Sequence, residues 1–360
     1  MPRVIVGLSG GVDSSVPAAL LKQQGFEVIG VFMKNWSEDL GDYGCTWAED
    51  SEDARRAARH LGIPFYVWNF EREYRDKVVD YFFREYQANR TPNPDVMCNT
   101  EIKFKIFLEK ALSLGADFVA TGHYARVKSG QGRGKREEFQ LLKGIDPGKD
   151  QSYFLYTLNQ SQLSRILFPL GGYYKSEVRA LARKFGLPNA EKKDSQGICF
   201  IGPINVREFL KTQLRATAGE VVTAAGEAVG RHEGLPYYTI GQRQGFQAGG
   251  RGPYYVIGKD LPGNRLLVTN DRQDPALWQD KFTLTQVTWS NQAPALPLKT
   301  GVSIRYHHPD YPALITAVDS GKLSISFDSP QRAITPGQAA VVYRGEELLG
   351  GGIIESVSAT

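Results

Sequence analysis

The sequence predicts an α/β protein in which a Rossmann-like parallel-sheet domain is followed by a small mainly-β central domain and a C-terminal β-barrel. Two observations predict this class. Short apolar runs alternate with amphipathic stretches through the first 120 residues, as in a parallel sheet covered by helices. After about residue 205, short alternating runs bounded by Gly, Pro, Asn or Asp indicate an all-β region. We therefore expect domains at residues 1–205, 206–275 and 276–360.

The N-terminal elements follow from hydrophobic periodicity. Four short apolar runs have the length of buried strands, and the stretches between them repeat apolar residues at helical spacing. In such a sheet a ligand binds beyond the carboxyl ends of the strands. The expected strands are 4–8, 28–33, 65–70 and 118–121, and the expected helices are 14–24, 51–61, 71–86, 103–114 and 175–186.

The sequence pattern after about residue 205 predicts strands along most of its length. Its apolar residues alternate with polar ones, which is typical of strands with one buried face. The segment 289–298 interrupts this pattern with proline and polar residues. The expected strand segments are 219–229, 253–259, 265–268, 282–289, 301–306, 313–318, 323–327 and 339–343.

Composition limits the class of protein. Of the 360 residues, 41% are hydrophobic and 23% are charged, which is ordinary for a globular protein. No apolar run reaches the roughly 18 to 20 residues that span a bilayer, and the first strand begins without a signal-peptide pattern, so we expect a cytoplasmic protein without membrane contact. The net charge of +4 permits an RNA partner without requiring one.

The segment 7–15, GLSGGVDSS, lies where the first strand turns into a helix. It lacks the lysine of GxxxxGK[ST] and the spacing of GxGxxG. A helix N-terminus with close-approaching glycines still favours an anion, and serine hydroxyls can donate to phosphate oxygens. Asp13 in such a site suggests a Mg²⁺ ion that bridges phosphates. A capped helix after a tight turn is the alternative, but the whole string favours a nucleotide.

Three cysteines, Cys45, Cys98 and Cys199, are too few for a disulfide scaffold, and none forms a CxxC pair. The prolines before Cys98 predict that its thiol lies in a loop ahead of the helix at 103, and Cys199 follows the helix at 175–186 in a second loop. Two thiols in loops suit a nucleophile and a resolving partner, although free cysteines are often small buried apolar residues. An iron–sulfur cluster on all three is a further alternative without a supporting motif.

The string SGGVDSS resembles the pyrophosphatase loop of the ATP-pyrophosphatase (PP-loop) superfamily, whose members split ATP into AMP and pyrophosphate to activate a substrate oxygen. The chain as a whole resembles the tRNA-specific 2-thiouridylase family within it. The resemblance spans nearly the full chain. It rests on MKNW (33–36), RTPNPDVMCN (90–99), EIKF (101–104), ATGHY (120–124), KDQSYFLYTL (149–158), DSQGICFIG (194–202), TIGQR (239–243), TPGQ (335–338) and LGGGII (349–354).

This resemblance implies an adenine nucleotide alpha hydrolase-like fold and an ATP- and Mg²⁺-dependent enzyme that adenylates the wobble uridine of Lys, Glu or Gln type tRNA. Cys199 would carry a persulfide from a cysteine desulfurase or relay protein, and Cys98 would be its partner, ending in a transient disulfide with Cys199. The products would be 2-thiouridine, AMP and pyrophosphate, and we expect a monomer. A uridine carbonyl is a poor electrophile, and its adenylate makes AMP a good leaving group.

The resemblance also assigns contacts. ATP would be bound by Gly7, Leu8, Ser9, Gly10, Gly11, Val12, Asp13, Ser14, Met33 and Gly122, and Asp13 is the candidate magnesium ligand. The tRNA would be bound by Asn93, Pro94, Asp95, His123, Lys149, Asp150, Gln151, Arg305, Tyr306 and Gln338, with Asp95 as a candidate general acid or base.

Two other function classes stay open. Another PP-loop enzyme, one that forms an amide or adds lysine, would not need Cys98 and Cys199. A non-catalytic nucleotide- or RNA-binding module would release no pyrophosphate. Some single residues also have structural explanations: His123 after a strand could be a buried hydrogen-bonding residue. Adjacent His307 and His308 on an expected strand would face opposite sides and make poor joint metal ligands.

Overall fold

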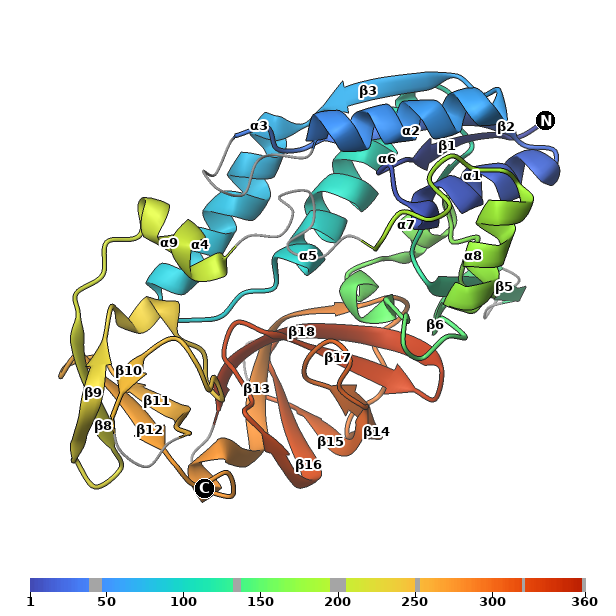
Figure 1. The fold of residues 1–360 in the computed structure, drawn as a ribbon. Helices are drawn as coiled ribbons and strands as arrows, with labels where there is room; N and C mark the ends of the chain where they lie inside the picture. The colour runs from blue at the N-terminus through green and yellow to red at the C-terminus, as the bar shows by residue number, and fades with distance from the viewer. Residues whose placement is uncertain (39–46, 132–136, 195–204, 250–252, 319–320, 358–360) are drawn as a thin grey trace.

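The computed structural model describes residues 1–38, 47–131, 137–194, 205–249, 253–318 and 321–357. The described residues form three sheets, which confirms the predicted order of a parallel-sheet domain, a small β region and a barrel. Figure 1 shows the parallel sheet with its helices above the two β regions, which lie side by side below it. None of the described helices is both long and apolar enough to cross a membrane.

The N-terminal sheet is parallel and has the strand order β3-β2-β1-β4-β7. Its central strand β1 alternates between two cores. Val4 and Val6 pack with helices on one face, whereas Ile5 belongs to the core on the other face. The sheet is therefore doubly wound. Its strands are β1 (Arg3–Gly7), β2 (Glu27–Lys34), β3 (Phe65–Asn69), β4 (Phe118–Ala120) and β7 (Ile166–Leu167).

Two long helical segments cover the Ile5 face of this sheet, and two helices cover the other. The amphipathic periodicity of each segment buries a stripe of aromatic or small residues. On the Val4 face lie α1 (Val12–Gln23) and α2 (Trp47–Leu61). On the Ile5 face the first segment consists of α3 (Glu71–Tyr74), η1 (Arg75–Val79) and α4 (Asp80–Gln87), and the second of α5 (Pro94–Met97), η2 (Cys98–Phe107) and α6 (Leu108–Ser113).

The expectation that the second segment stays irregular until residue 103 is wrong. The helix begins at Pro94, because proline fits the first helical position, where its missing N–H has no partner to lose. The Asn93 side chain caps this helix by accepting a hydrogen bond of 3.2 Å from the Val96 N–H. Cys98 therefore lies in a helix and not in a loop, and it is fully buried.

The central region folds around a five-stranded sheet of order β10-β9-β8-β12-β11. The expected strand 219–229 is a hairpin instead, since the chain turns at Gly226, which adopts a φ of 84°. Helix α9 (Val206–Gln213), which is not among the expected helices, leads into it. The strands are β8 (Gly219–Thr223), β9 (Ala228–His232), β10 (Gln247–Ala248), β11 (Tyr255–Asp260) and β12 (Arg265–Thr269).

The C-terminal strands close into a barrel of order β13-β16-β15-β14-β17-β18, because β18 also pairs with β13. At the closure a Cβ on Gly350 would lie 2.2 Å from the Thr288 carbonyl oxygen, so only glycine permits this approach. The expected strand 301–306 ends early at Ser303, and Arg305 to His308 form a turn in which His307 has a φ of 59°. The strands are β13 (Trp278–Trp289), β14 (Leu298–Ser303), β15 (Tyr311–Ala317), β16 (Leu323–Arg332), β17 (Ala339–Arg344) and β18 (Glu347–Val357).

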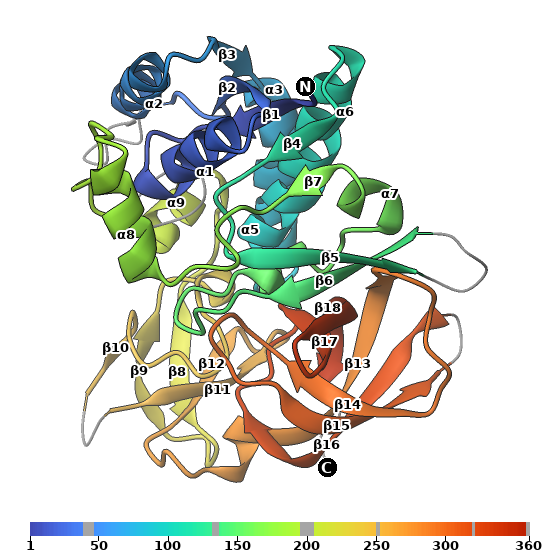
Figure 2. The same ribbon diagram turned by 90° about the vertical axis from the view of Figure 1, so that its right-hand side faces the viewer.

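A hairpin from the N-terminal segment extends the barrel sheet. Strands β5 (Ala125–Gln131) and β6 (Glu137–Lys143) follow the parallel sheet in sequence, yet Leu141 and Leu142 of β6 pair with β18. Figure 2 shows this hairpin between the parallel sheet and the barrel. The remaining short elements are η3 (Ser152–Leu155), α7 (Gln160–Leu163), α8 (Lys175–Lys184), η4 (Leu235–Tyr237) and η5 (Pro275–Leu277).

Candidate active site

The loop between β1 and α1 uses its own hydroxyl groups for internal hydrogen bonds. The Ser14 hydroxyl donates to the Gly11 carbonyl oxygen at 3.0 Å, and the Ser15 hydroxyl donates to the same oxygen at 3.1 Å. The Ser9 N–H in turn donates to the Ser14 hydroxyl oxygen at 3.0 Å. Because a hydroxyl carries one hydrogen, Ser14 and Ser15 shape the loop here instead of facing a phosphate.

The donors that remain in the loop are backbone amides. The N–H groups of Gly10, Gly11, Val12 and Asp13 make no hydrogen bond to a described residue. They stand at the N-terminus of α1, whose N-cap Gly11 offers no side-chain oxygen. Amides without a described partner, together with the helix dipole, give this turn the chemistry to bind an anion through the backbone.

Two glycines let neighbouring elements reach the loop. A Cβ on Gly10 would lie 2.3 Å from the Asp50 carbonyl oxygen of α2, and a Cβ on Gly122 would lie 2.0 Å from the Asp13 carbonyl oxygen. The end of β4 therefore lies directly against the start of α1. Met33 reaches the base of the loop, since its Cε would be 3.0 Å from a Cβ on Gly7. The structure thus brings Met33 and Gly122, both predicted nucleotide contacts, to the loop.

The segment after α8 supports the loop from outside, although no pattern in its sequence predicts this contact. The buried Asn189 side chain donates to the Gly10 carbonyl oxygen at 2.8 Å and to the Ser15 hydroxyl at 2.9 Å. These partners are more than 170 residues away along the chain. A lone asparagine after a helix carries no periodic signal, so only the fold reveals this contact.

Asp13 is held by a lysine. The Lys175 ammonium lies 2.7 Å from both carboxylate oxygens of Asp13, and the Tyr124 hydroxyl donates to Asp13 Oδ1 at 2.9 Å. Among the residues that the structure describes, no group of three or more His, Cys, Asp or Glu side chains is placed to hold a metal ion. The described surroundings of Asp13 therefore fit an ammonium partner and do not form a preassembled Mg²⁺ site.

Asp194 forms ion pairs with three cationic side chains, and in the sequence it lies just before the segment that carries Cys199. Its carboxylate lies 2.7 Å from the Lys149 and Lys175 ammonium groups and 2.8 Å from the Arg179 guanidinium. Partial burial opposes ionisation, but the hydrogen bonds from Lys149 and Lys175 outweigh it and lower the pKa of Asp194 to about 2. Cys199 and Cys45 themselves lie outside the described residues.

The predicted base-contacting residues Asn93, Pro94 and Asp95 are half-buried at the start of the helix that contains Cys98. The residues just before them are held by the barrel. The Gln338 side-chain amide donates to the Thr91 carbonyl oxygen at 2.9 Å and to the Pro92 carbonyl oxygen at 3.2 Å. Gln338, predicted to contact tRNA, therefore contacts the protein loop in this structure.

His123 occupies a buried position at the end of β4. Its Nδ1 lies 2.7 Å from the Thr121 hydroxyl, and its ring packs against Phe104 and Phe168. Burial, together with the charge of Lys103, lowers the pKa of His123 well below its usual value, so the imidazole is neutral at pH 7. A direct contact of His123 with tRNA stays a prediction.

The other predicted tRNA contacts lie at the junction of the N-terminal segment with the barrel. Burial raises the pKa of Asp150, although hydrogen bonds from Gly144 and Ser152 oppose this. The Gln151 side chain accepts a hydrogen bond from the Tyr124 N–H at 3.1 Å. In the turn after β14, Arg305 donates to the Arg332 carbonyl oxygen, and the ring centroid of Tyr306 is 4.4 Å from that of Phe154.

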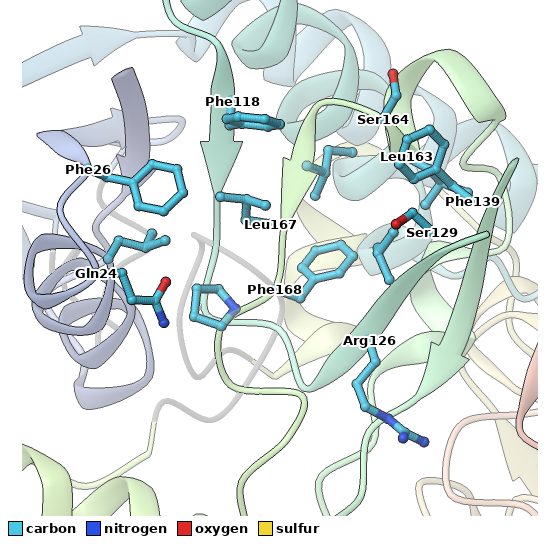
Figure 3. A pocket seen from close by; sticks show the side chains of 14 residues that line it. Gln24, Phe26, Phe118, Arg126, Ser129, Phe139, Leu163, Ser164, Leu167 and Phe168 are labelled. Atoms are coloured by element: carbon cyan, nitrogen blue, oxygen red, sulfur yellow. The ribbon is translucent and has the colours of Figure 1, made fainter. Parts of the chain in front are cut away.

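A pocket of about 360 Å³ opens elsewhere, and none of the predicted site residues lines it. In Figure 3, Phe26, Phe118 and Phe168 border it, and Arg126 lies at its side. Phe168, which lines the pocket, also packs against His123, with their ring centroids 5.8 Å apart. The predicted site residues therefore lie at the loop edge of the sheet and not in this pocket.

Comparisons with known proteins agree with this arrangement. The chain matches three family descriptions in order: a tRNA methyl transferase HUP domain at residues 2–203, a tRNA methyl transferase PRC-barrel domain at 207–270 and an aminomethyltransferase beta-barrel domain at 279–354. It is 51% identical to the tRNA-specific 2-thiouridylase MnmA of Geobacillus thermodenitrificans, over 99% of this chain and 95% of that protein. The protein of the same name from Halalkalibacterium halodurans is 52% identical, with the same coverage of both chains.

Proposed function

Since the chain belongs to the family of tRNA-specific 2-thiouridylases, which makes it a tRNA sulfurtransferase, we propose how its residues carry out the thiolation of a tRNA uridine. The loop 7–14 holds the phosphates of ATP through its backbone amides, and Met33 and Gly122 border the adenosine. The observation that carries the proposal is the set of backbone N–H groups at Gly10 to Asp13 that have no described partner. Mg²⁺ would enter with the nucleotide and offset phosphate charge.

The first chemical step activates the uridine. The oxygen on carbon 2 of the wobble uridine attacks the α-phosphorus of ATP, the bond from that phosphorus to the bridging oxygen breaks, and pyrophosphate leaves. The base must leave its stack to be reached, which costs least in an anticodon loop. Asn93, Pro94 and Asp95 would hold the extruded base because they lie at the start of the helix that carries Cys98.

The second step installs sulfur. The terminal sulfur of a persulfide on Cys199 attacks carbon 2, and the bond to the adenylate oxygen breaks to release AMP. The Cys98 thiolate then attacks the Cys199 sulfur, which breaks the persulfide bond, leaves the sulfur on the base and forms a disulfide between Cys98 and Cys199. A dithiol reductant restores the thiols. Because Cys98 is fully buried in this structure, its thiol must be uncovered before it reacts.

The partners follow from this chemistry. tRNA is the substrate, and most of its affinity would come from phosphate contacts around the base pocket. A cysteine desulfurase or a sulfur-relay protein would deliver the persulfide. We also propose that the protein works as a monomer.

The deciding assay incubates the protein with ATP, Mg²⁺, tRNA and a persulfide donor, followed by mass spectrometry of the digested nucleosides. We expect 2-thiouridine, and its absence while tRNA binds would contradict the proposal. Cys98→Ser and Cys199→Ser should each abolish the product, whereas Cys45→Ser should retain it as the matched control. Activity that survives loss of both Cys98 and Cys199 would indicate a ligase, and loss in Cys45→Ser would indicate a site on three cysteines.

A further inference from the structure

The phosphate loop has no lysine of its own, but the fold brings one to it. Lys175 is the first residue of α8 and lies 162 positions from Asp13 along the chain. Its ammonium is 2.7 Å from both carboxylate oxygens of Asp13, and its side chain is 16% exposed. Asp13 stands in the first turn of α1, next to the backbone amides that have no partner among the described residues. The ammonium therefore lies beside the anion site.

The pairing of Asp13 does not match the role of a magnesium ligand. A metal ion would need the carboxylate oxygens that Lys175 and Tyr124 contact here. Tyr124 stays a neutral donor, since burial, helped by the charge of Asp13, raises the pKa of its hydroxyl well above the usual value. The described residues thus give Asp13 the surroundings of a carboxylate that orients a cation of the protein itself.

We propose that Lys175 is the phosphate-binding lysine of this site, aligned by Asp13 to contact the β- and γ-phosphates of ATP and the pyrophosphate that leaves. The inference rests on the proposed function, because it takes the loop to be the ATP site. It assigns Asp13 to the positioning of Lys175 instead of to the coordination of Mg²⁺. A charged hydrogen bond to a phosphate is stronger than a neutral one, which gives the lysine a direct part in nucleotide affinity.

The Lys175 ammonium can exchange the Asp194 carboxylate for a phosphate oxygen, because Asp194 would keep other cationic partners. Its three N–H donors face Asp13 Oδ1, Asp13 Oδ2 and Asp194 Oδ1, each at 2.7 Å. If a phosphate oxygen replaces Asp194, that carboxylate keeps Lys149 at 2.7 Å and Arg179 at 2.8 Å. Asp13 remains as the second partner that fixes the direction of the ammonium. Binding therefore requires a change of one hydrogen bond and no rearrangement of the loop.

The test measures binding by calorimetry on the full chain, with inorganic pyrophosphate, ATP and AMP as separate probes and with neither tRNA nor sulfur donor present. Lys175→Gln should lower the affinity for pyrophosphate and for ATP by about tenfold or more. It should lower the affinity for AMP by less than about twofold, because AMP lacks the outer phosphates. Lys175→Arg should recover part of the affinity. The matched control is Lys192→Gln, which removes the same charge from a lysine that pairs with Asp50 and Asp53 of α2. It should leave all three affinities within about twofold.

Equal pyrophosphate affinities of the wild type and Lys175→Gln would overturn the proposal. A loss of AMP affinity as large as the loss of pyrophosphate affinity would also overturn it. A second arm compares Asp13→Asn and the wild type in Mg²⁺ and in EDTA. A positioning role predicts the same fold-loss of pyrophosphate affinity in both buffers, whereas a loss seen only with Mg²⁺ would restore the metal-ligand role and refute the assignment. Failure of the proposed function would show itself differently, as a wild type that binds these ligands but forms no 2-thiouridine.

Discussion

The side-chain amide of Gln338 donates hydrogen bonds to the carbonyl oxygens of Thr91, at 2.9 Å, and Pro92, at 3.2 Å. The Thr91 N–H donates in return to the Pro336 carbonyl oxygen at 2.9 Å. The Thr91 hydroxyl also lies 2.9 Å from that of Thr239 in the central region. All three parts of the chain therefore meet at Thr91, two residues before the predicted base-contacting residues.

Gln338→Ala is expected to slow thiolation by about tenfold or more, because loss of two hydrogen bonds to the backbone frees the residues that hold the base. If Gln338 acts through the loop, tRNA affinity should stay within about twofold of wild type at fixed salt, since no phosphate contact is lost. The measurements are single-turnover thiolation and tRNA titration, with the exposed Gln292→Ala as control. A large loss of tRNA affinity with an unchanged single-turnover rate would instead favour the direct tRNA contact that the sequence predicts.

Asn189→Ala should destabilise the protein by about 1 to 3 kcal/mol and weaken ATP binding, because the buried Gly10 carbonyl loses its described side-chain donor. Denaturant unfolding and ATP titration measure the two effects. Asn205→Ala is the control: it removes the cap of α9, at a cost of about 1 kcal/mol, far along the chain from the loop. An ATP affinity equally reduced in both variants would show that global stability, and not the loop, is responsible.

Gly122→Ala should cost about 1 to 3 kcal/mol or more and disrupt nucleotide binding, since its Cβ would meet the Asp13 backbone at 2.0 Å and force β4 and α1 apart. Gly130→Ala provides the comparison, because a Cβ there meets nothing within 4 Å. Its unfolding free energy should stay within about 0.5 kcal/mol of wild type. Thermal or denaturant unfolding of both variants checks the difference, and normal stability of Gly122→Ala would contradict the packing.

The charge of Asp194 predicts a pH-dependent contribution to stability. Its folded pKa of about 2 lies below the usual value of 3.8, so the folded state favours the ionised form. The stabilisation is present in full above the unfolded pKa and is lost as the pH falls from about 4 through the folded value of about 2. The unfolding free energy of wild type minus that of Asp194→Asn should therefore be constant from pH 7 to 5 and shrink below pH 4. A difference that does not change with acid would contradict the pairing with Lys149 and Lys175.

Local patterns determined much of the fold. Strong hydrophobic periodicity predicts the strands at the centre of the parallel sheet and the helices that cover it. The structure confirms these elements. The prediction for Cys98 was wrong because proline was taken only as a helix breaker, whereas Pro94 starts a helix. The hairpin β5–β6 and strand β18 were not expected, although each has a pairing partner nearby in sequence, and only the tertiary structure joins β6 to β18 and β18 to β13. Pairing of that kind depends on tertiary context more than on residue type.

The sequence by itself determined the family, the loop proposed to hold an anion and the thiols proposed for sulfur transfer, because these depend on residue types at short spacing. Only the tertiary structure decided which side chains surround the loop. Lys175 and Asn189 reach it from more than 160 residues away, and Gln338 reaches Thr91 across 247 positions. The physical reason is that a hydrogen bond or an ion pair depends on distance in space, and folding sets that distance through packing that no short stretch of sequence encodes.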